Sequence, residues 1–234
     1  MNKKEYLERE LKRVGYSGKI VGFSKCKKCG LCCLRNACSC AVSDFDEITV
    51  ESSEKIIDSG KYMITASYTV NEKGFPIKAV PHISAREVNS PKNGVNITMI
   101  HSKCAMLTDN GCALTEDDRP SQGLLLIPIG EDCKAFMDTP TEQWKPYMHI
   151  LDQVVIKRTG KSSQQLFEDE FPNLANRLKR KVQMSILYNN NPIEFAEYQA
   201  IDLIEKWGYY HAMYGTDFGN MIRDFIDSVK VKPY

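Results

Sequence analysis

The sequence predicts an α+β protein in which a cysteine-rich part with a small antiparallel sheet precedes a helical part. Six of the nine cysteines fall between residues 26 and 40. Hydrophobic residues then alternate with a period of two over 62–70, a pattern typical of a strand. Beyond residue 139 they recur at helical spacing. We therefore divide the chain into a cysteine-cluster region, 1–138, and a helical region, 139–234. No long flexible linker separates the two, so they could also form one compact unit.

In the first region, two helices are expected. One covers 3–13, with Tyr6, Leu7 and Leu11 on one side. The other follows Ser43-Asp-Phe-Asp-Glu47, which offers two N-cap candidates, and ends near Gly60.

Three strands are expected after these helices. The alternation over 62–70 predicts a strand with one buried face. The loop 71–74 predicts a hairpin to a second strand, 75–83, whose Pro76 and Pro81 indicate an edge or irregular strand. A third strand candidate, 95–101, leads into Cys104.

The helical region begins with Thr139-Pro-Thr-Glu142, a capping box with proline at the first helical position. One face of the helix that follows carries Trp144, Tyr147, Met148, Leu151, Val154 and Val155. Further amphipathic helices are expected over 173–186, 193–207 and 218–229.

Composition limits the classes of function. The 234 residues are 42% hydrophobic and 26% charged, which supports a packed core and excludes a disordered chain. Thirty-one basic and thirty acidic residues give no overall electrostatic support for binding nucleic acid or an anionic membrane. No apolar run reaches the roughly 18 residues of a membrane span, and the first ten residues contain no signal-peptide core. We expect a cytoplasmic protein that binds neither nucleic acid nor membrane.

The cysteines predict that the first region binds metal. Their odd number, the expected reducing compartment and their tight spacing argue against a disulfide framework. Cys26, Cys29 and Cys32 recur at steps of three residues, followed directly by Cys33, and such a loop can wrap its sulfurs around one centre. The first 35 residues contain ten basic and three acidic side chains, and the positive charge favours thiolates.

The motif Cys26-x-x-Cys29-x-x-Cys32-Cys33 resembles the signature of the CxxCxxCC (YkgJ-like) cysteine-cluster family, described as zinc- or iron-chelating proteins. Downstream family elements resemble Cys104-Ala-Met-Leu107, Asp109-Asn-Gly-Cys112, Arg119-Pro120 and Cys133-Lys-Ala-Phe136. The resemblance covers about residues 24–136 and implies that Cys33, Cys104, Cys112 and Cys133 join the first three cysteines as ligands.

The chain departs from the family pattern in two places. Ser121-Gln-Gly123 follows Arg119-Pro120 where the family has its last cysteine, so Cys133 comes after an apparent insertion that contains 124–129. Cys38 and Cys40 lie outside the motif. They either belong to a second centre or replace a missing ligand.

The number of cysteines favours iron–sulfur over zinc. A structural zinc uses four ligands, usually two separated pairs, and adjacent Cys32 and Cys33 can hardly both face one small ion. A [4Fe–4S] cluster takes four thiolates, so two clusters would use eight of the nine cysteines.

The sequence is compatible with three functions. The first is a protein with one or two [4Fe–4S] clusters that transfers electrons to a protein partner or senses redox state. The second is a zinc-stabilised module that docks a partner. The third is a cluster-dependent methyltransferase-like enzyme, by analogy with relatives of the motif that are associated with methylation of flagellin lysines. No phosphate-binding loop and no hydrolase pattern occurs in the sequence, and no catalytic residue is assigned.

Overall fold

The computed structural model describes residues 1–16, 33–34, 37–70, 76–97, 102–129, 132–135 and 140–169. Cys26, Cys29 and Cys32 lie outside these ranges, as do the helices predicted beyond residue 170. The described part combines helices with small antiparallel sheets, which confirms the α+β class. None of its helices has the length and apolar character that crossing a bilayer would require.

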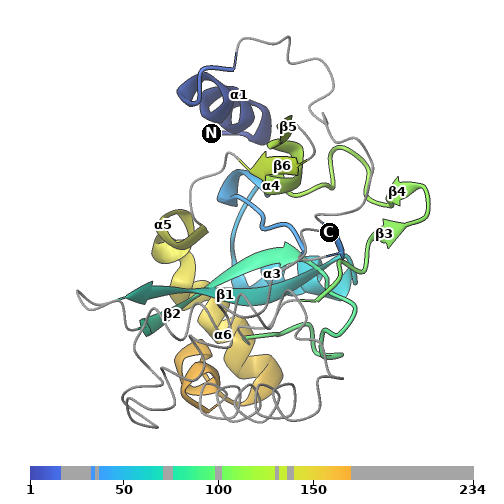
Figure 1. The fold of residues 1–234 in the computed structure, drawn as a ribbon. Helices are drawn as coiled ribbons and strands as arrows, with labels where there is room; N and C mark the ends of the chain where they lie inside the picture. The colour runs from blue at the N-terminus through green and yellow to red at the C-terminus, as the bar shows by residue number, and fades with distance from the viewer. Residues whose placement is uncertain are drawn as a thin grey trace, which may run out of the picture.

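A long hairpin lies at the centre of the described part (Figure 1). Strand β1 (Tyr62–Val70) pairs antiparallel with β2 (Pro76–Ala85), and Ile64 lies opposite Ile83. The predicted hairpin is confirmed, and β1 has the predicted bounds. Helices α3 (Val50–Asp58), α5 (Pro140–Trp144) and α6 (Met148–Thr159) contact this hairpin.

The prediction that the first strand is buried on one face is wrong for its first half. Ile64 lies in the main core, but Met63 and Thr65, on the opposite face, are also 0% and 2% exposed. The loop after β2 folds over this face, where the Ser90 hydroxyl donates to the Met63 sulfur at 2.9 Å. An alternating sequence pattern cannot reveal that a loop will cover the second face.

The predicted third strand is not formed within the described residues 95–97. Only one parallel bridge joins Val95 to Ile64 there, held by hydrogen bonds from Ile64 N–H to the Gly94 carbonyl at 2.9 Å and from Asn96 N–H to the Ile64 carbonyl at 2.8 Å. The segment therefore lies along the free edge of β1 without extending the sheet.

The main core joins residues from both predicted regions. Trp144, which is fully buried, donates its indole N–H to the Cys40 carbonyl at 3.0 Å and contacts the rings of Phe45 and Tyr147 edge-on. The buried members of this main core are Cys40, Ile48, Ile57, Tyr62, Ile64, Ala66, Ala79, Val80, Ile83, Val95, Ile97, Trp144, Leu151, Val154, Val155 and Phe167. Residues 140–169 thus share a core with 37–97, while the boundary at 138/139 for the whole chain stays a prediction.

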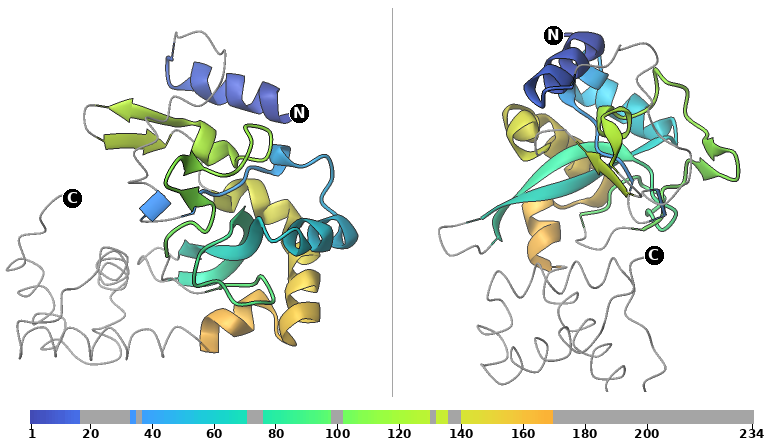
Figure 2. Two further views of the ribbon diagram at one scale, coloured as in Figure 1. Left: turned by 90° about the vertical axis from the view of Figure 1, so that its right-hand side faces the viewer. Right: turned by 45° about the horizontal axis from the view of Figure 1, so that its top comes forward.

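Helix α1 (Lys3–Arg13) confirms the first predicted helix and has a core of its own. Its capping box pairs Asn2 with Glu5. The helix lies near α4 (Ser121–Leu124), at the end of the described part opposite α6 (Figure 2). This second core consists of Tyr6, Leu7, Leu11, Ala41, Leu124 and Leu125. The Lys3 ammonium also donates to the carbonyls of Asp117 at 2.7 Å and Arg119 at 2.6 Å.

The N-cap expected within 43–47 is wrong, although the helix does end near Gly60. Residues Val42–Asp44 form a 3-10 turn, and α3 begins after Thr49, whose hydroxyl accepts the Ser52 N–H at 3.1 Å. Asp44 is occupied elsewhere, because its carboxylate accepts hydrogen bonds from the Ala41 N–H at 2.9 Å and from Ser121.

The single helix expected after Thr139 is interrupted. Pro140 is its first residue, as predicted, but α5 ends at Trp144 and a 3-10 turn, Lys145–Tyr147, leads into α6. Pro146 explains the break, because proline has no N–H to continue an α-helix.

The short strands form two further hairpins. Strand β3 (Leu107–Thr108) pairs with β4 (Gly111–Cys112), and β5 (Leu126–Ile129) pairs with β6 (Asp132–Ala135). The apparent insertion therefore supplies the end of α4 and all of β5.

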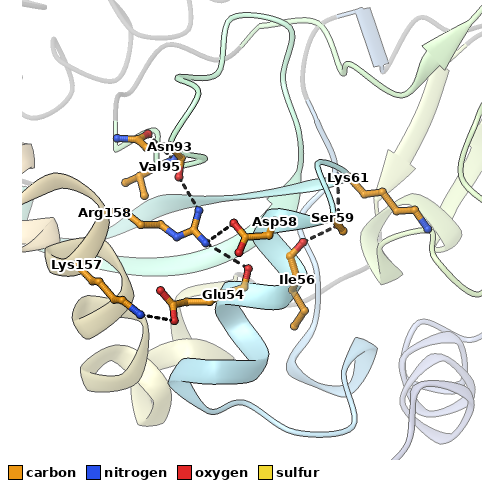
Figure 3. A network of polar contacts seen from close by, with 9 residues as sticks. All are labelled: Glu54, Ile56, Asp58, Ser59, Lys61, Asn93, Val95, Lys157 and Arg158. Carbon is orange, nitrogen blue, oxygen red and sulfur yellow. Dashed lines mark hydrogen bonds and ion pairs between the residues drawn. The ribbon is translucent and has the colours of Figure 1, made fainter.

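Hydrogen bonds and ion pairs join α6 to α3 and to the loop at Asn93 (Figure 3). The Arg158 guanidinium donates to the Asp58 carboxylate at 2.7 Å and to the carbonyls of Glu54 at 3.3 Å and Asn93 at 3.1 Å. Lys157 pairs with the Glu54 carboxylate at 2.7 Å. These contacts hold residue 94 close to α3.

Alanine in place of Gly94 is expected to destabilise the protein more than alanine in place of Gly60. Both glycines have positive φ, +72° and +73°, which costs another residue roughly 1 kcal/mol. A Cβ at Gly94 would lie 2.3 Å from the Ile57 side chain, whereas nothing lies within 4 Å at Gly60. The overpacking adds about 1–3 kcal/mol at Gly94. Urea unfolding measures both variants, and equal losses would contradict the tight approach of residue 94 to α3.

Candidate metal centre

Two cysteines from distant parts of the sequence meet in the described structure. The Cys104 N–H donates to the Cys33 carbonyl at 2.8 Å. The two side chains also share a small apolar cluster with Ala37, Ala85 and Met106. The carboxyl end of the cysteine motif therefore lies against the first downstream cysteine.

A second segment holds Cys104 from another side. Glu87, just after β2, forms an antiparallel bridge with Cys104. Hydrogen bonds run from the Val88 N–H to the Lys103 carbonyl at 2.9 Å and from the Ala105 N–H to the Arg86 carbonyl at 2.8 Å. Cys104 is thus fixed by backbone bonds to Cys33 and, through its neighbours, to 86–88.

The surroundings of the Cys104 thiol act on its pKa in opposite directions. Burial raises the pKa most, and the charges of Cys112 and Glu87 raise it further. Hydrogen bonds from the backbone N–H groups of Met106 and Leu107 lower it. Without a cation the neutral thiol is favoured, whereas a bound metal would favour the thiolate that these N–H groups can stabilise.

Cys112 lies in β4, opposite Leu107 of β3, and its thiol is half-buried. It is close enough for its charge to act on Cys104 and on Tyr62, whose pKa is raised mainly by burial. Among the side chains that the structure describes, no three of the His, Cys, Asp or Glu type gather around one metal-sized point. The described part thus brings Cys33 and Cys104 together, with Cys112 near them, and contains no complete ligand set.

Cys40 behaves as a core residue. Its segment lies along β2, with hydrogen bonds from the Cys40 N–H to the Ile83 carbonyl and from the Ala85 N–H to the Cys38 carbonyl, both 2.9 Å. The Cys40 side chain is fully buried, and this burial, more than the charges of Asp44 and Cys38, raises the pKa of its thiol well above the ordinary value, while Lys3 opposes the rise.

Cys38 has a more open environment than Cys40. Its thiol is half-buried, and a Cβ added at Gly123 would lie 3.3 Å from its sulfur. Residue 123 belongs to the Ser121-Gln-Gly123 stretch that follows Arg119-Pro120, so Cys38 lies near this stretch.

The other predicted ligands are placed only in part. Cys133 lies in β6 with its backbone opposite Pro128 of β5. Cys26, Cys29 and Cys32 fall outside the described residues. The structure describes five thiols, those of Cys33, Cys38, Cys40, Cys104 and Cys112, and no two of these five are joined by a disulfide.

Two buried carboxylates near these cysteines were not predicted as functional. The Glu87 side chain is 2% exposed, and its carboxylate accepts the Ser102 N–H at 3.0 Å. Asp44 lies in the segment 43–47 where an N-cap was expected. Burial raises the pKa of its carboxyl above the ordinary value, while Lys3 and hydrogen bonds from Ser121 and Ala41 oppose the rise. No local pattern in the sequence distinguishes these carboxylates from solvated ones, because partners far along the chain bury them.

Comparison of the chain with protein-family models, with curated proteins and with solved structures found no match. The resemblance of the cysteine motif to the CxxCxxCC family therefore stays a prediction.

Proposed function

We propose that this protein holds one or two [4Fe–4S] clusters on its cysteine thiolates and uses them to transfer electrons or to sense redox state, with a protein partner in the cytoplasm. The observation that carries the proposal is the contact between Cys33 and Cys104, joined by the 2.8 Å hydrogen bond and a shared apolar cluster. This contact places the end of the cysteine motif beside a cysteine far along the sequence. A cluster with ligands from the motif and from Cys104 would require such a contact.

The donor chemistry fits such a cluster. Cys32 directly precedes Cys33 in the sequence, so the residue that contacts Cys104 is the last of the motif Cys26-x-x-Cys29-x-x-Cys32-Cys33. The Met106 and Leu107 N–H groups directed at the Cys104 sulfur are the kind of donors that stabilise cluster thiolates.

In this proposal the cluster supplies one-electron oxidation and reduction when bound. The chain holds and shields it. Cys26, Cys29, Cys32 and Cys104 are the first candidates for its four ligands, and Cys33, Cys112 and Cys133 are the next. Cys38 and Cys40 would contribute only to a second centre or as substitutes.

The test is the metal and sulfide content of the full chain purified without oxygen. About four irons with matching acid-labile sulfide per chain would support one cluster, and about eight would support two and include the extra cysteines. One or two zincs without sulfide would overturn the iron–sulfur assignment in favour of a zinc-stabilised docking module. Absence of both metals would overturn metal binding altogether.

A further inference from the structure

Glu87 is a buried carboxylate whose hydrogen bonds lead to the segment that carries Cys104. Its side chain is 2% exposed. One carboxylate oxygen accepts the Ser102 N–H at 3.0 Å and lies 3.4 Å from the Ser102 hydroxyl. Hydrogen bonds to a charged acceptor are stronger than neutral ones, and burial limits the competition from water. The carboxylate thus holds the backbone two residues before Cys104.

The backbone of Glu87 is fixed as well. Its N–H donates to the Ser90 hydroxyl at 3.0 Å, and this hydroxyl donates to the buried Met63 sulfur at 2.9 Å. The antiparallel bridge with Cys104 adds a direct backbone link. Glu87 therefore connects the central hairpin to the Cys104 segment through both its backbone and its side chain.

The placement also has an electrostatic cost. A carboxylate beside a thiolate repels it, and the charge of Glu87 acts on the Cys104 sulfur. An uncharged side chain could fill the same space without this repulsion. Against this repulsion, the carboxylate contributes its hydrogen bonds to Ser102.

We propose that Glu87 is the positioning residue of Cys104, holding the 102–104 segment through Ser102 so that the thiol stays beside Cys33 and available to a metal. The link to a metal rests on the proposed function. The positioning itself does not, because it can be measured on the metal-free protein.

The test compares Glu87→Ala, which removes the acceptor, with Glu87→Gln, which keeps an amide oxygen for the Ser102 N–H. Each full-length variant is stripped of metal under reducing conditions and alkylated with iodoacetamide, and mass spectrometry follows each cysteine. Cys104 is 5% exposed and needs local opening to react, whereas fully buried Cys40 reports opening of the main core.

We expect Glu87→Ala to accelerate alkylation of Cys104 roughly tenfold or more with Cys40 unchanged, because a charged hydrogen bond is lost locally. Glu87→Gln should restore most of the protection. Glu10→Ala is the matched control, since Glu10 is 1% exposed and bonded to Arg9 and Arg13 in α1, away from Cys104. It should not accelerate Cys104 selectively.

If Glu87→Ala accelerates alkylation of Cys104 and Cys40 equally, Glu87 only stabilises the protein in general and the proposal is overturned. Unchanged alkylation rates at both cysteines would also overturn it.

Metal retention in the presence of a chelator is the second measurement. We expect Glu87→Ala to lose metal and Glu87→Gln to retain it. Selective labelling of Cys104 in a chain that binds no metal would support the positioning while the proposed function fails. If the protein binds metal but the Glu87 variants match the unchanged protein in cysteine alkylation and metal retention, the proposed function stands and the positioning role of Glu87 is overturned.

Discussion

Alanine in place of Cys104 is expected to remove most of the bound metal, whereas alanine in place of Cys40 is expected to leave most of it. Cys104 lies beside Cys33 at the end of the cysteine motif, with backbone N–H groups directed at its sulfur. Cys40 is fully buried in the main core, where burial holds its thiol neutral. Loss of one of four thiolate ligands normally leaves a cluster labile.

The two variants are matched, because both remove one sulfur from a buried site with 5% and 0% exposure. Metal and sulfide per folded chain are measured after anaerobic purification, and circular dichroism confirms that each variant is folded. Cys29→Ser should behave like the Cys104 variant, as the motif predicts. Equal metal content in the Cys104 and Cys40 variants would contradict this ranking of the ligands.

Alanine in place of Trp144 is expected to lower the free energy of unfolding by about 3–5 kcal/mol, the usual cost of emptying a large buried aromatic site. Trp144 is fully buried, and its ring contacts Phe45 and Tyr147. Its indole N–H also binds the Cys40 carbonyl at 3.0 Å. The loss is therefore a large share of the 5–15 kcal/mol typical of a whole domain.

Two further variants separate the contributions of Trp144. Trp144→Phe keeps most of the packing but loses the hydrogen bond to Cys40, so a loss of about 1–2 kcal/mol is expected. Ile156→Ala, on α6 at 47% exposure, should change stability by less than about 0.5 kcal/mol. Denaturant unfolding of the three variants is followed by far-ultraviolet circular dichroism, a backbone signal that does not depend on the tryptophan that is replaced. A Trp144→Ala loss as small as that of Ile156→Ala would contradict the shared core.

Metal content and core packing are independent in these predictions. The Trp144 variants act on the core that joins α5 to the central hairpin, whereas the Cys104 variant acts on the contact with Cys33. A Trp144→Phe protein that still folds should therefore keep its metal.

Local sequence patterns predicted the elements whose signals are local. The alternation over 62–70 gave the bounds of β1, and Tyr6, Leu7 and Leu11 marked the buried side of α1. The patterns failed where distant partners intervened. Asp44 accepts hydrogen bonds from Ser121 instead of capping α3, and a loop covers the second face of β1 at Met63.

In the candidate site, too, local sequence patterns predicted one part and long-range packing decided the rest. The sequence by itself determined the spacing of Cys26, Cys29, Cys32 and Cys33, from which metal binding is predicted. Only the tertiary structure decided that Cys104 lies beside Cys33, that Cys40 belongs to the core, and that Glu87 is buried against Ser102. Burial and long-range hydrogen bonds depend on residues far apart in the sequence, and those partners meet only when the chain packs.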